Sequence, residues 1–263
     1  MQSGGVEEPV FGVASFHLVR EPAWRAPVAL ARLGTDRLHL RGTPGLRFVR
    51  LLGTGRGATA LGADLARTAL FAVWDGPAAL TAFEAGWFAE RSARVQAAGG
   101  EVYGLRLGLL SGHGRWGGRD LLADLRSARA PATDGPVAVL TRATVRPSRW
   151  HRFRGSRPPV SRELARARGL RAAVGIGEAP VGLQATFSIW SDAAAVTSFA
   201  RGPEHRAVVR RTREEGWYGE ELFARFAPLG STGTWDGRDP LSGPLSGGRL
   251  SGGPVSGDRL SGD

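Results

Sequence analysis

The amino-acid sequence predicts an α+β protein in which two tandem ferredoxin-like βαββαβ units form a pseudo-dimeric α/β barrel. The first observation behind this prediction is an internal repeat within the first 240 residues. Residues 71–74 (FAVW) match residues 187–190 (FSIW) at an offset of 116, and residues 114–120 match residues 233–239 at an offset of 119. The second observation is that strand-length apolar segments alternate with helix-like stretches in the same order in both halves.

The elements of each half follow from apolar runs of strand length and from stretches with helical periodicity. In the first half the expected strands are 11–19, 46–52, 67–74 and 101–109, and the expected helices are 22–33 and 77–98. In the second half the expected strands are 136–145, 170–177, 183–190 and 219–227, and the expected helices are 161–168 and 192–215. A βαββαβ unit carries its helices on one face of its sheet, so two copies can cover each other's bare faces.

The repeat also predicts how the chain is divided. We expect a first ferredoxin-like repeat over residues 1–120, a second over residues 121–240, and a C-terminal tail over residues 241–263. The tail repeats Leu-Ser-Gly or Val-Ser-Gly between glycine, proline, aspartate and arginine residues. Such a composition cannot offset chain entropy by burial, which predicts a disordered tail without a catalytic role.

Composition excludes several kinds of chemistry. The 263 residues contain no cysteine, which rules out disulfides, thiolate nucleophiles, cysteine-bound zinc, iron–sulfur clusters and thiolate-ligated haem. The formal net charge of +11 suits acidic proteins or anionic membranes as partners. No nucleic-acid reader motif accompanies this charge, so we expect no specific nucleic-acid binding. The absence of a signal-peptide pattern and of a bilayer-length apolar run predicts a cytoplasmic protein, which can still contact a membrane peripherally.

A glycine-rich loop after the second expected strand offers a competing interpretation. Residues 53–58 (GTGRGA) satisfy the G-x-G-x-x-A pattern of dinucleotide-binding loops, and Asp75 lies at the end of the next strand. However, the stretch that follows the loop contains Gly62 and makes a poor crossover helix, and the matching loop of the second half contains Pro180. We therefore expect these glycines to turn the chain between two strands.

Among the five histidines, His205 has the setting that best suits a ligand. The segment 191–216 is expected to break at Gly202-Pro203 and to restart as a helix, in which His205, Val208 and Val209 share one face. A first-turn position disfavours the imidazolium form, and a neutral imidazole is the form that binds a metal. A buried structural histidine remains the alternative. No H-x-x-x-H or H-E-x-x-H pattern supports a zinc or facial-triad iron site, whereas a lone axial histidine suits haem.

Six short blocks occur together in one order and carry a family resemblance. They are residues 48–57 (FVRLLGTGRG), 139–143 (VLTRA), 175–178 (GIGE), 184–190 (QATFSIW), 199–201 (FAR) followed by His205, and 217–226 (WYGEELFARF). Over about residues 11–240 the chain resembles the spheroidene monooxygenase (acyclic carotenoid 2-ketolase) family. The resemblance implies a monooxygenase that uses haem b, O2 and reduced ferredoxin to hydroxylate an acyclic carotenoid at C-2 or to form a ketone there.

The resemblance also implies roles for particular residues. His205 would be the axial ligand of the haem iron, leaving the sixth position open for O2. Arg142, Gln184 and Thr186 are candidates for the distal wall, although an ordinary half-buried strand would show the same polar pattern. Three further candidates are cofactor-binding: Glu178, which would orient a polar group near the glycine loop, and Arg201 and Arg206, which with Arg142 could pair with the haem propionates.

Two other classes of function stay open at this point. Some relatives in the family oxidise small natural-product precursors such as nitro-amino acids, so the resemblance does not fix the substrate. A different class is a non-catalytic barrel that holds a lipophilic ligand. Electrons would come from a separate acidic ferredoxin in the enzyme hypothesis, because the sequence has no convincing flavin or nicotinamide site.

Overall fold

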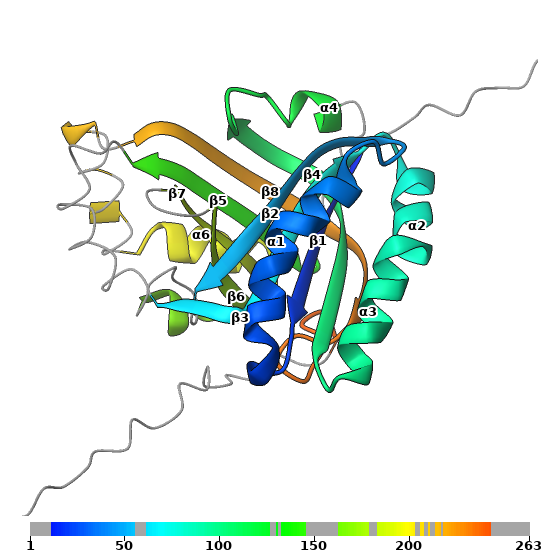
Figure 1. The fold of residues 1–263 in the computed structure, drawn as a ribbon. Helices are drawn as coiled ribbons and strands as arrows, with labels where there is room; N and C mark the ends of the chain where they lie inside the picture. The colour runs from blue at the N-terminus through cyan, green and yellow to red at the C-terminus, as the bar shows by residue number, and fades with distance from the viewer. Residues whose placement is uncertain are drawn as a thin grey trace, which may run out of the picture.

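The structure, a computed structural model, is a closed eight-stranded barrel with helices on the outside (Figure 1). It describes residues 12–55, 62–126, 130, 133–145, 163–178, 183–202, 206–207, 210, 214–216 and 218–242. The strand order around the barrel is β1-β3-β2-β6-β7-β5-β8-β4. The strands are β1 (Val13–Arg20), β2 (Leu46–Gly55), β3 (Ala63–Trp74), β4 (Glu101–Gly114), β5 (Val137–Val145), β6 (Leu170–Gly177), β7 (Leu183–Trp190) and β8 (Tyr218–Gly233).

The two halves of the barrel have the same topology, as the repeat predicted. The first half runs β4-β1-β3-β2 and the second runs β8-β5-β7-β6, with antiparallel pairing throughout. The halves join along most of β4 and β8 and at a short contact where Gly53 and Thr54 of β2 pair with β6. The antiparallel pairing of β2 with β3 excludes a dinucleotide-binding βαβ unit, which requires parallel strands. The rest of the glycine loop, residues 56–61, lies outside the described residues.

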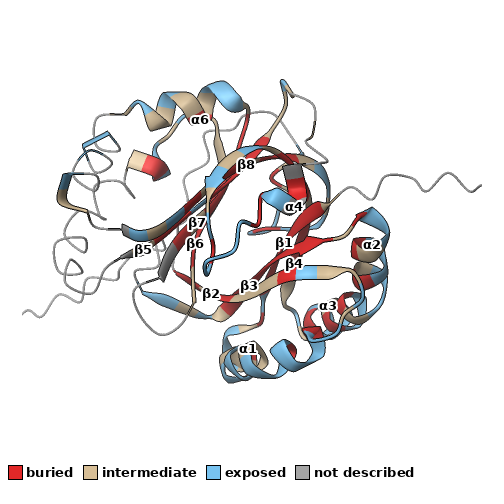
Figure 2. Cartoon of the chain, turned by 90° about the horizontal axis from the view of Figure 1, so that it is seen from above, coloured by how far each residue is buried: buried red, intermediate tan, exposed pale blue. Residues whose placement is uncertain are grey.

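Helices cover the outer face of the first half (Figure 2). They are the short 3-10 helix η1 (Ala23–Arg25), α1 (Ala26–Leu40), α2 (Pro77–Ala85) and α3 (Trp87–Ala97). The expected helix 22–33 begins later, at Ala26, and continues through Gly34 to Leu40. The expected helix 77–98 divides at Gly86, whose ψ of −113° is not helical.

The second half has less described helix on its outer face. Helix α6 (Ala193–Ala200) begins where Asp192 accepts a hydrogen bond from the backbone N–H of Ala195, and it ends before Gly202, where the sequence predicted a break. Beyond the break, residues 206–207, 210 and 214–215 are helical. His205 lies outside the described residues. Of the expected helix 161–168, the described part is helical at 163–165. The short helix α4 (Ala123–Arg126) follows the first half.

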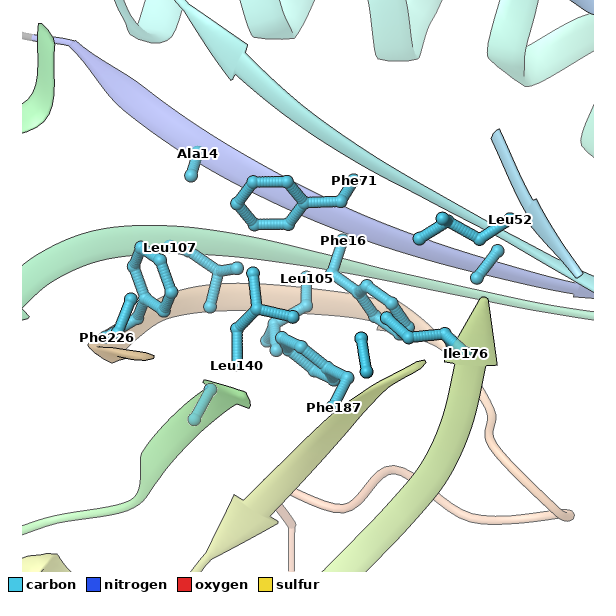
Figure 3. Close-up of a cluster of buried hydrophobic side chains, with 14 of the residues drawn as sticks. Ala14, Phe16, Leu52, Phe71, Leu105, Leu107, Leu140, Ile176, Phe187 and Phe226 are labelled. Atoms are coloured by element: carbon cyan, nitrogen blue, oxygen red, sulfur yellow. The ribbon is translucent and has the colours of Figure 1, made fainter. Parts of the chain in front are cut away.

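Both halves contribute to one apolar core inside the barrel (Figure 3). The rings of Phe16 and Phe187, one from each half, stack with their centroids 3.8 Å apart. The interior of an eight-stranded barrel is just wide enough for such side chains. Trp116 and Trp235 follow β4 and β8 in equivalent bridged turns, and both are buried against the core. The interior is therefore packed, which places any large ligand outside the barrel and disfavours the hypothesis of a lipophilic ligand within it.

The predicted division at residue 120 separates two repeats that share this core. Leu241, at the start of the predicted tail, packs against the core, and Ser242 donates its backbone N–H to Asp239. The rest of the tail, residues 243–263, lies outside the described residues, so its predicted disorder stays a prediction.

Candidate functional site

The outer face of the second sheet carries small and polar side chains at one end. On β5 the side chains of Ala138 and Leu140 join the barrel core, so Thr141 points outward by strand alternation. The strand register places Thr141 opposite Thr186 of β7 on one side and opposite Phe223 of β8 on the other. Thr186 in turn lies opposite Gly175 of β6. One row across the sheet therefore reads Gly175, Thr186, Thr141, Phe223.

The equivalent row of the first half is filled by larger side chains on three of its four strands. It reads Leu51, Leu70, His17, Gly104 from β2 to β4. His17 is 1% exposed and packs against Phe83 and Phe88 of the helices. In the second half, glycine and two threonines replace Leu51, Leu70 and His17, and Thr141 is exposed.

These exchanges put smaller side chains on β6, β7 and β5 in the second half. On β8 the exchange runs the other way, because Phe223 stands where the first half has Gly104. We call the region over Gly175, Thr186 and Thr141, bounded by Phe223, the outer hollow. The name refers to the smaller side chains of this row compared with the equivalent row of the first half.

An apolar cluster adjoins the outer hollow toward the start of β5 and the end of β7. Trp190 packs its ring against Phe199 of α6, with centroids 5.3 Å apart, as Trp74 does with Phe83 in the first half at 4.8 Å. Val137 and Val139 of β5 complete this cluster below the helix. The outer face of the second half thus carries an apolar cluster next to a row of small and polar side chains.

The two halves also differ in a charged cluster beside this row. In the first half, Glu84 of α2 contacts the buried His17, with Nε2 to Oε1 at 3.4 Å, and it accepts two hydrogen bonds from Arg106 of β4. Burial alone would raise the pKa of Glu84, but these hydrogen bonds outweigh it and the pKa lies below its ordinary value. The second half keeps the arginine as Arg225, while Ala200 occupies the place of the glutamate.

Arg142 does not lie in the outer hollow. It is 4% exposed, and strand alternation turns its side chain to the opposite sheet face from Thr186. There its guanidinium donates to Glu220 and to Thr144 Oγ1 and lies over the Trp116 ring. The expected common wall of Arg142 with Thr186 is therefore wrong. Sequence could not decide the face, because residues 137–140 are apolar at all four positions.

Glu178 lies at the same end of the barrel as Arg142. Its carboxylate accepts a hydrogen bond from Trp116 Nε1 at 2.8 Å and pairs with Arg50 Nε at 2.7 Å. Glu178 therefore fixes the tryptophan that closes the barrel, and within the described residues it is held by the first half of the chain. Its predicted counterpart, Arg56, lies outside the described residues.

The remaining candidates lie on β7, at the end of α6 and just beyond it. Gln184 and Thr186 are two residues apart on β7, so strand alternation places both positions on the outer face. Arg201 and Arg206 are exposed at the end of α6 and just beyond the break. Sequence reasoning missed Thr141 and Arg225. The repeat itself contained the signal, since the offsets of 116 and 119 align Glu84 with Ala200 and Arg106 with Arg225.

The described residues fit a flat, largely apolar cofactor on the outer face of the second half. The observation is the outer hollow itself, in which three bulky side chains of one copy are replaced by Gly175, Thr141 and Thr186 in the other. The adjoining apolar cluster lies under α6 beside these positions, and Arg225 of β8 offers a cation next to the row. Within the described part of the chain, no group of three or more histidine, aspartate or glutamate side chains is placed to hold a metal ion by itself.

Solved structures show the class of fold. An aldoxime dehydratase in complex with butyraldoxime aligns with a TM-score of 0.57 at 10% identity, over 84% of this chain and 81% of that one. A second aldoxime dehydratase structure aligns with a TM-score of 0.53 at 12% identity, over 84% and 83%. The fold thus defines an α/β-barrel protein of the dimeric type, with both barrel halves in one chain.

Curated relatives show the family. The spheroidene monooxygenase of Rhodobacter capsulatus is 36% identical over 233 residues, which is 88% of this chain and 95% of the relative. The spheroidene monooxygenase of Rubrivivax gelatinosus is 39% identical over 202 residues, 75% of this chain and 74% of the relative. No family model matches the chain. The chain belongs to the spheroidene monooxygenase family and is a monooxygenase, as the resemblance implied.

A search of the described helices for a membrane span finds none that is long and apolar enough.

Proposed function

We propose that this monooxygenase uses haem b, bound in the outer hollow, to oxidise a spheroidene-type acyclic carotenoid at C-2 to an alcohol or a ketone. The observation that carries the proposal is the loss of bulk from Leu51, Leu70 and His17 to Gly175, Thr186 and Thr141 at equivalent positions of the two halves. The relatives named spheroidene monooxygenase supply the substrate class.

The residues of the second half divide the work between holding the cofactor and shaping the reaction space. Haem, when bound, would supply an iron that activates O2. His205 is the residue that we assign to the iron, through a neutral imidazole nitrogen. Thr186 and Thr141 present hydroxyl groups on the floor of the hollow and can donate or accept a hydrogen bond there. Gln184 is the third candidate on this face.

The neighbouring apolar cluster favours a hydrocarbon substrate over a charged one. Trp190 and Val139 are buried under α6 and pack with the partly buried Phe199, so the surroundings of the outer hollow are apolar and would favour an apolar polyene. The carboxylate and amine of a nitro-amino acid would lose their hydration against such a surface without gaining partners. We therefore place the carotenoid ahead of the amino-acid substrate.

Two partners belong to the proposal. Reduced ferredoxin, an acidic protein, would deliver electrons to a chain with a net charge of +11. A membrane surface would supply the lipophilic substrate. Helix α1 and the residues before it expose Trp24 (75%), Leu30 (45%) and Leu38 (63%), with the exposed Arg37 and Arg41 beside them. An exposed apolar stripe with basic flanks is the composition of a helix that lies on an anionic bilayer.

A turnover assay tests the proposed reaction. Haem-loaded protein is incubated with spheroidene in detergent micelles, reduced ferredoxin and 18O2. The pigments are then separated, and their masses are measured by mass spectrometry. We expect one 18O atom in the product, at C-2. Thr186→Leu, which restores the first half's residue, should lose the activity, and Leu229→Ala on the exposed part of β8 should keep it. Unchanged spheroidene with haem-loaded wild type would contradict the substrate assignment.

A further inference from the structure

The two halves of the chain keep one arginine in common but not its partner. In the first half, Arg106 forms an ion pair with Glu84, which is about four-fifths buried as a side chain. In the second half, the equivalent Arg225 faces the outer side of β8, and within the described residues no carboxylate pairs with it. Its Nε is buried and has no hydrogen-bond partner among the residues that the structure describes.

The equivalence of the two positions rests on contacts that repeat in both halves. The ring pair of Trp74 and Phe83 corresponds to that of Trp190 and Phe199, which aligns α2 with α6 at an offset of 116. Glu84 and Ala200 are the next residues along these helices. The second half has therefore lost a carboxylate at the point where a retained guanidinium would meet it.

A buried guanidinium nitrogen without a partner is costly, because its hydration has been removed without replacement. Arg225 also lies against the Phe223 ring, with Cζ 5.4 Å from the ring centroid, and Phe223 bounds the outer hollow. A carboxylate brought by the ligand of the hollow would complete the site in the way that Glu84 completes the first one. Arginine suits this role because its planar fork matches a carboxylate.

We propose that Arg225 binds a propionate of the haem, in the place that Glu84 occupies beside Arg106. The proposal rests on the proposed function, because it takes haem as the ligand of the outer hollow. It assigns the anionic edge of the cofactor to β8 and to the end of α6, and it makes Arg225 a binding residue in addition to the exposed Arg201 and Arg206.

The test is a titration of apoprotein with haem and with haem dimethyl ester, in which both propionates are uncharged. The Soret band reports binding without any need for turnover. For wild type we expect the ester to bind about 10- to 100-fold more weakly, the size expected of a charge-assisted hydrogen bond. For Arg225→Gln, the affinity for haem should fall by a similar factor. The variant should then bind the ester about as tightly as it binds haem.

Two further variants separate a binding role from a structural one. Ala200→Glu restores the first half's carboxylate while Arg225 stays in place. The new carboxylate should compete for the guanidinium, so the affinity for haem should fall while the affinity for the ester changes little. Arg225→Lys should recover part of the affinity for haem. The matched control, Arg106→Gln, removes the equivalent arginine of the first half and should leave both affinities unchanged.

The outcomes distinguish this inference from the proposed function. If Arg225→Gln weakens haem and its dimethyl ester equally, Arg225 does not hold a propionate, although the protein is still a haem protein. If esterification of the propionates lowers the affinity of Arg225→Gln by as large a factor as it lowers that of wild type, another residue holds the propionate and the inference is wrong. If folded wild-type protein binds neither compound, both the inference and the proposed haem dependence are overturned.

Discussion

At the scale of single residues, the chemistry of the second half depends on side chains that have become smaller or have lost a partner. Thr141 and Thr186 stand where the first half buries His17 and Leu70, and Arg225 stands without the glutamate that Arg106 has. The other predicted residues, Arg142 and Glu178, instead hold the end of the barrel closed around Trp116. Residue type alone could not separate these two groups.

Filling the outer hollow should prevent cofactor binding without unfolding the protein. Thr186→Leu combined with Thr141→His reproduces the first half's side chains, which the same backbone accommodates there. Since overpacking costs about 1–3 kcal/mol, we expect haem to bind about tenfold more weakly or worse. The measurement is a Soret titration together with thermal unfolding. The converse change, Leu70→Thr, should lower stability and leave haem affinity intact, and equal haem affinity in the filled variant would refute the location.

Glu220 makes the barrel end sensitive to acid. Burial would raise its pKa, but hydrogen bonds from the backbone N–H groups of Gly118 and Gly117 and from Arg142 lower it below the ordinary 4.5. A depressed pKa stabilises the fold fully above the unfolded-state value, and this contribution is lost as pH falls through the folded-state value. Stability should therefore decline below about pH 4.5.

Urea unfolding as a function of pH measures this effect. Glu220→Gln should reduce the free energy of unfolding at pH 7 by about 1–3 kcal/mol, the usual size of a charge-assisted hydrogen bond. It should also flatten the dependence of this free energy on pH between about 3 and 5. The exposed neighbour offers a control, Glu221→Gln, which should behave as wild type. If the free energy of unfolding of Glu220→Gln falls at low pH as much as that of wild type, other carboxylates cause the loss of stability in acid.

At the scale of elements, the internal repeat predicted the order and type of the strands because matching motifs fix equivalent positions. It could not fix which face each side chain takes, because β5 begins with four consecutive apolar residues and only its pairing with β7 and β8 decides the faces. The ends of β4 and β8 were also missed. Both strands run on to glycine, Gly114 and Gly233, because they pair with each other and need no apolar pattern there.

Helix α1 allows a test of membrane contact. Trp24→Ala with Leu38→Ala removes two exposed apolar side chains, and we expect about tenfold weaker sedimentation with vesicles of phosphatidylglycerol and phosphatidylcholine, since each buried side chain contributes about 1.5–3 kcal/mol at most. Binding should also fall with rising salt. Leu229→Ala, another exposed leucine, is the control. If wild-type protein does not sediment with the vesicles at low salt, α1 does not dock on membranes.

At the scale of the whole molecule, the two halves act as one folding unit with divided tasks. The first half buries its outer face under α1, α2 and α3, and the second keeps the outer hollow, while the interior core belongs to both. Because the Phe16–Phe187 stack crosses between the halves, Phe187→Ala should cost about 3–5 kcal/mol and unfolding should remain a single transition. Two separate transitions by circular dichroism and tryptophan fluorescence would contradict a shared core.

The account's central claim is that the second half binds haem through His205, and the absorption spectrum of the haem-loaded protein tests it most directly. The control is His39→Ala, because His39 is an exposed histidine of α1 in the other half. We expect a Soret band of equal intensity in wild type and His39→Ala, and its loss or a clear shift with weaker binding in His205→Ala. An unchanged band in His205→Ala, or no band in folded wild-type protein, would contradict the claim.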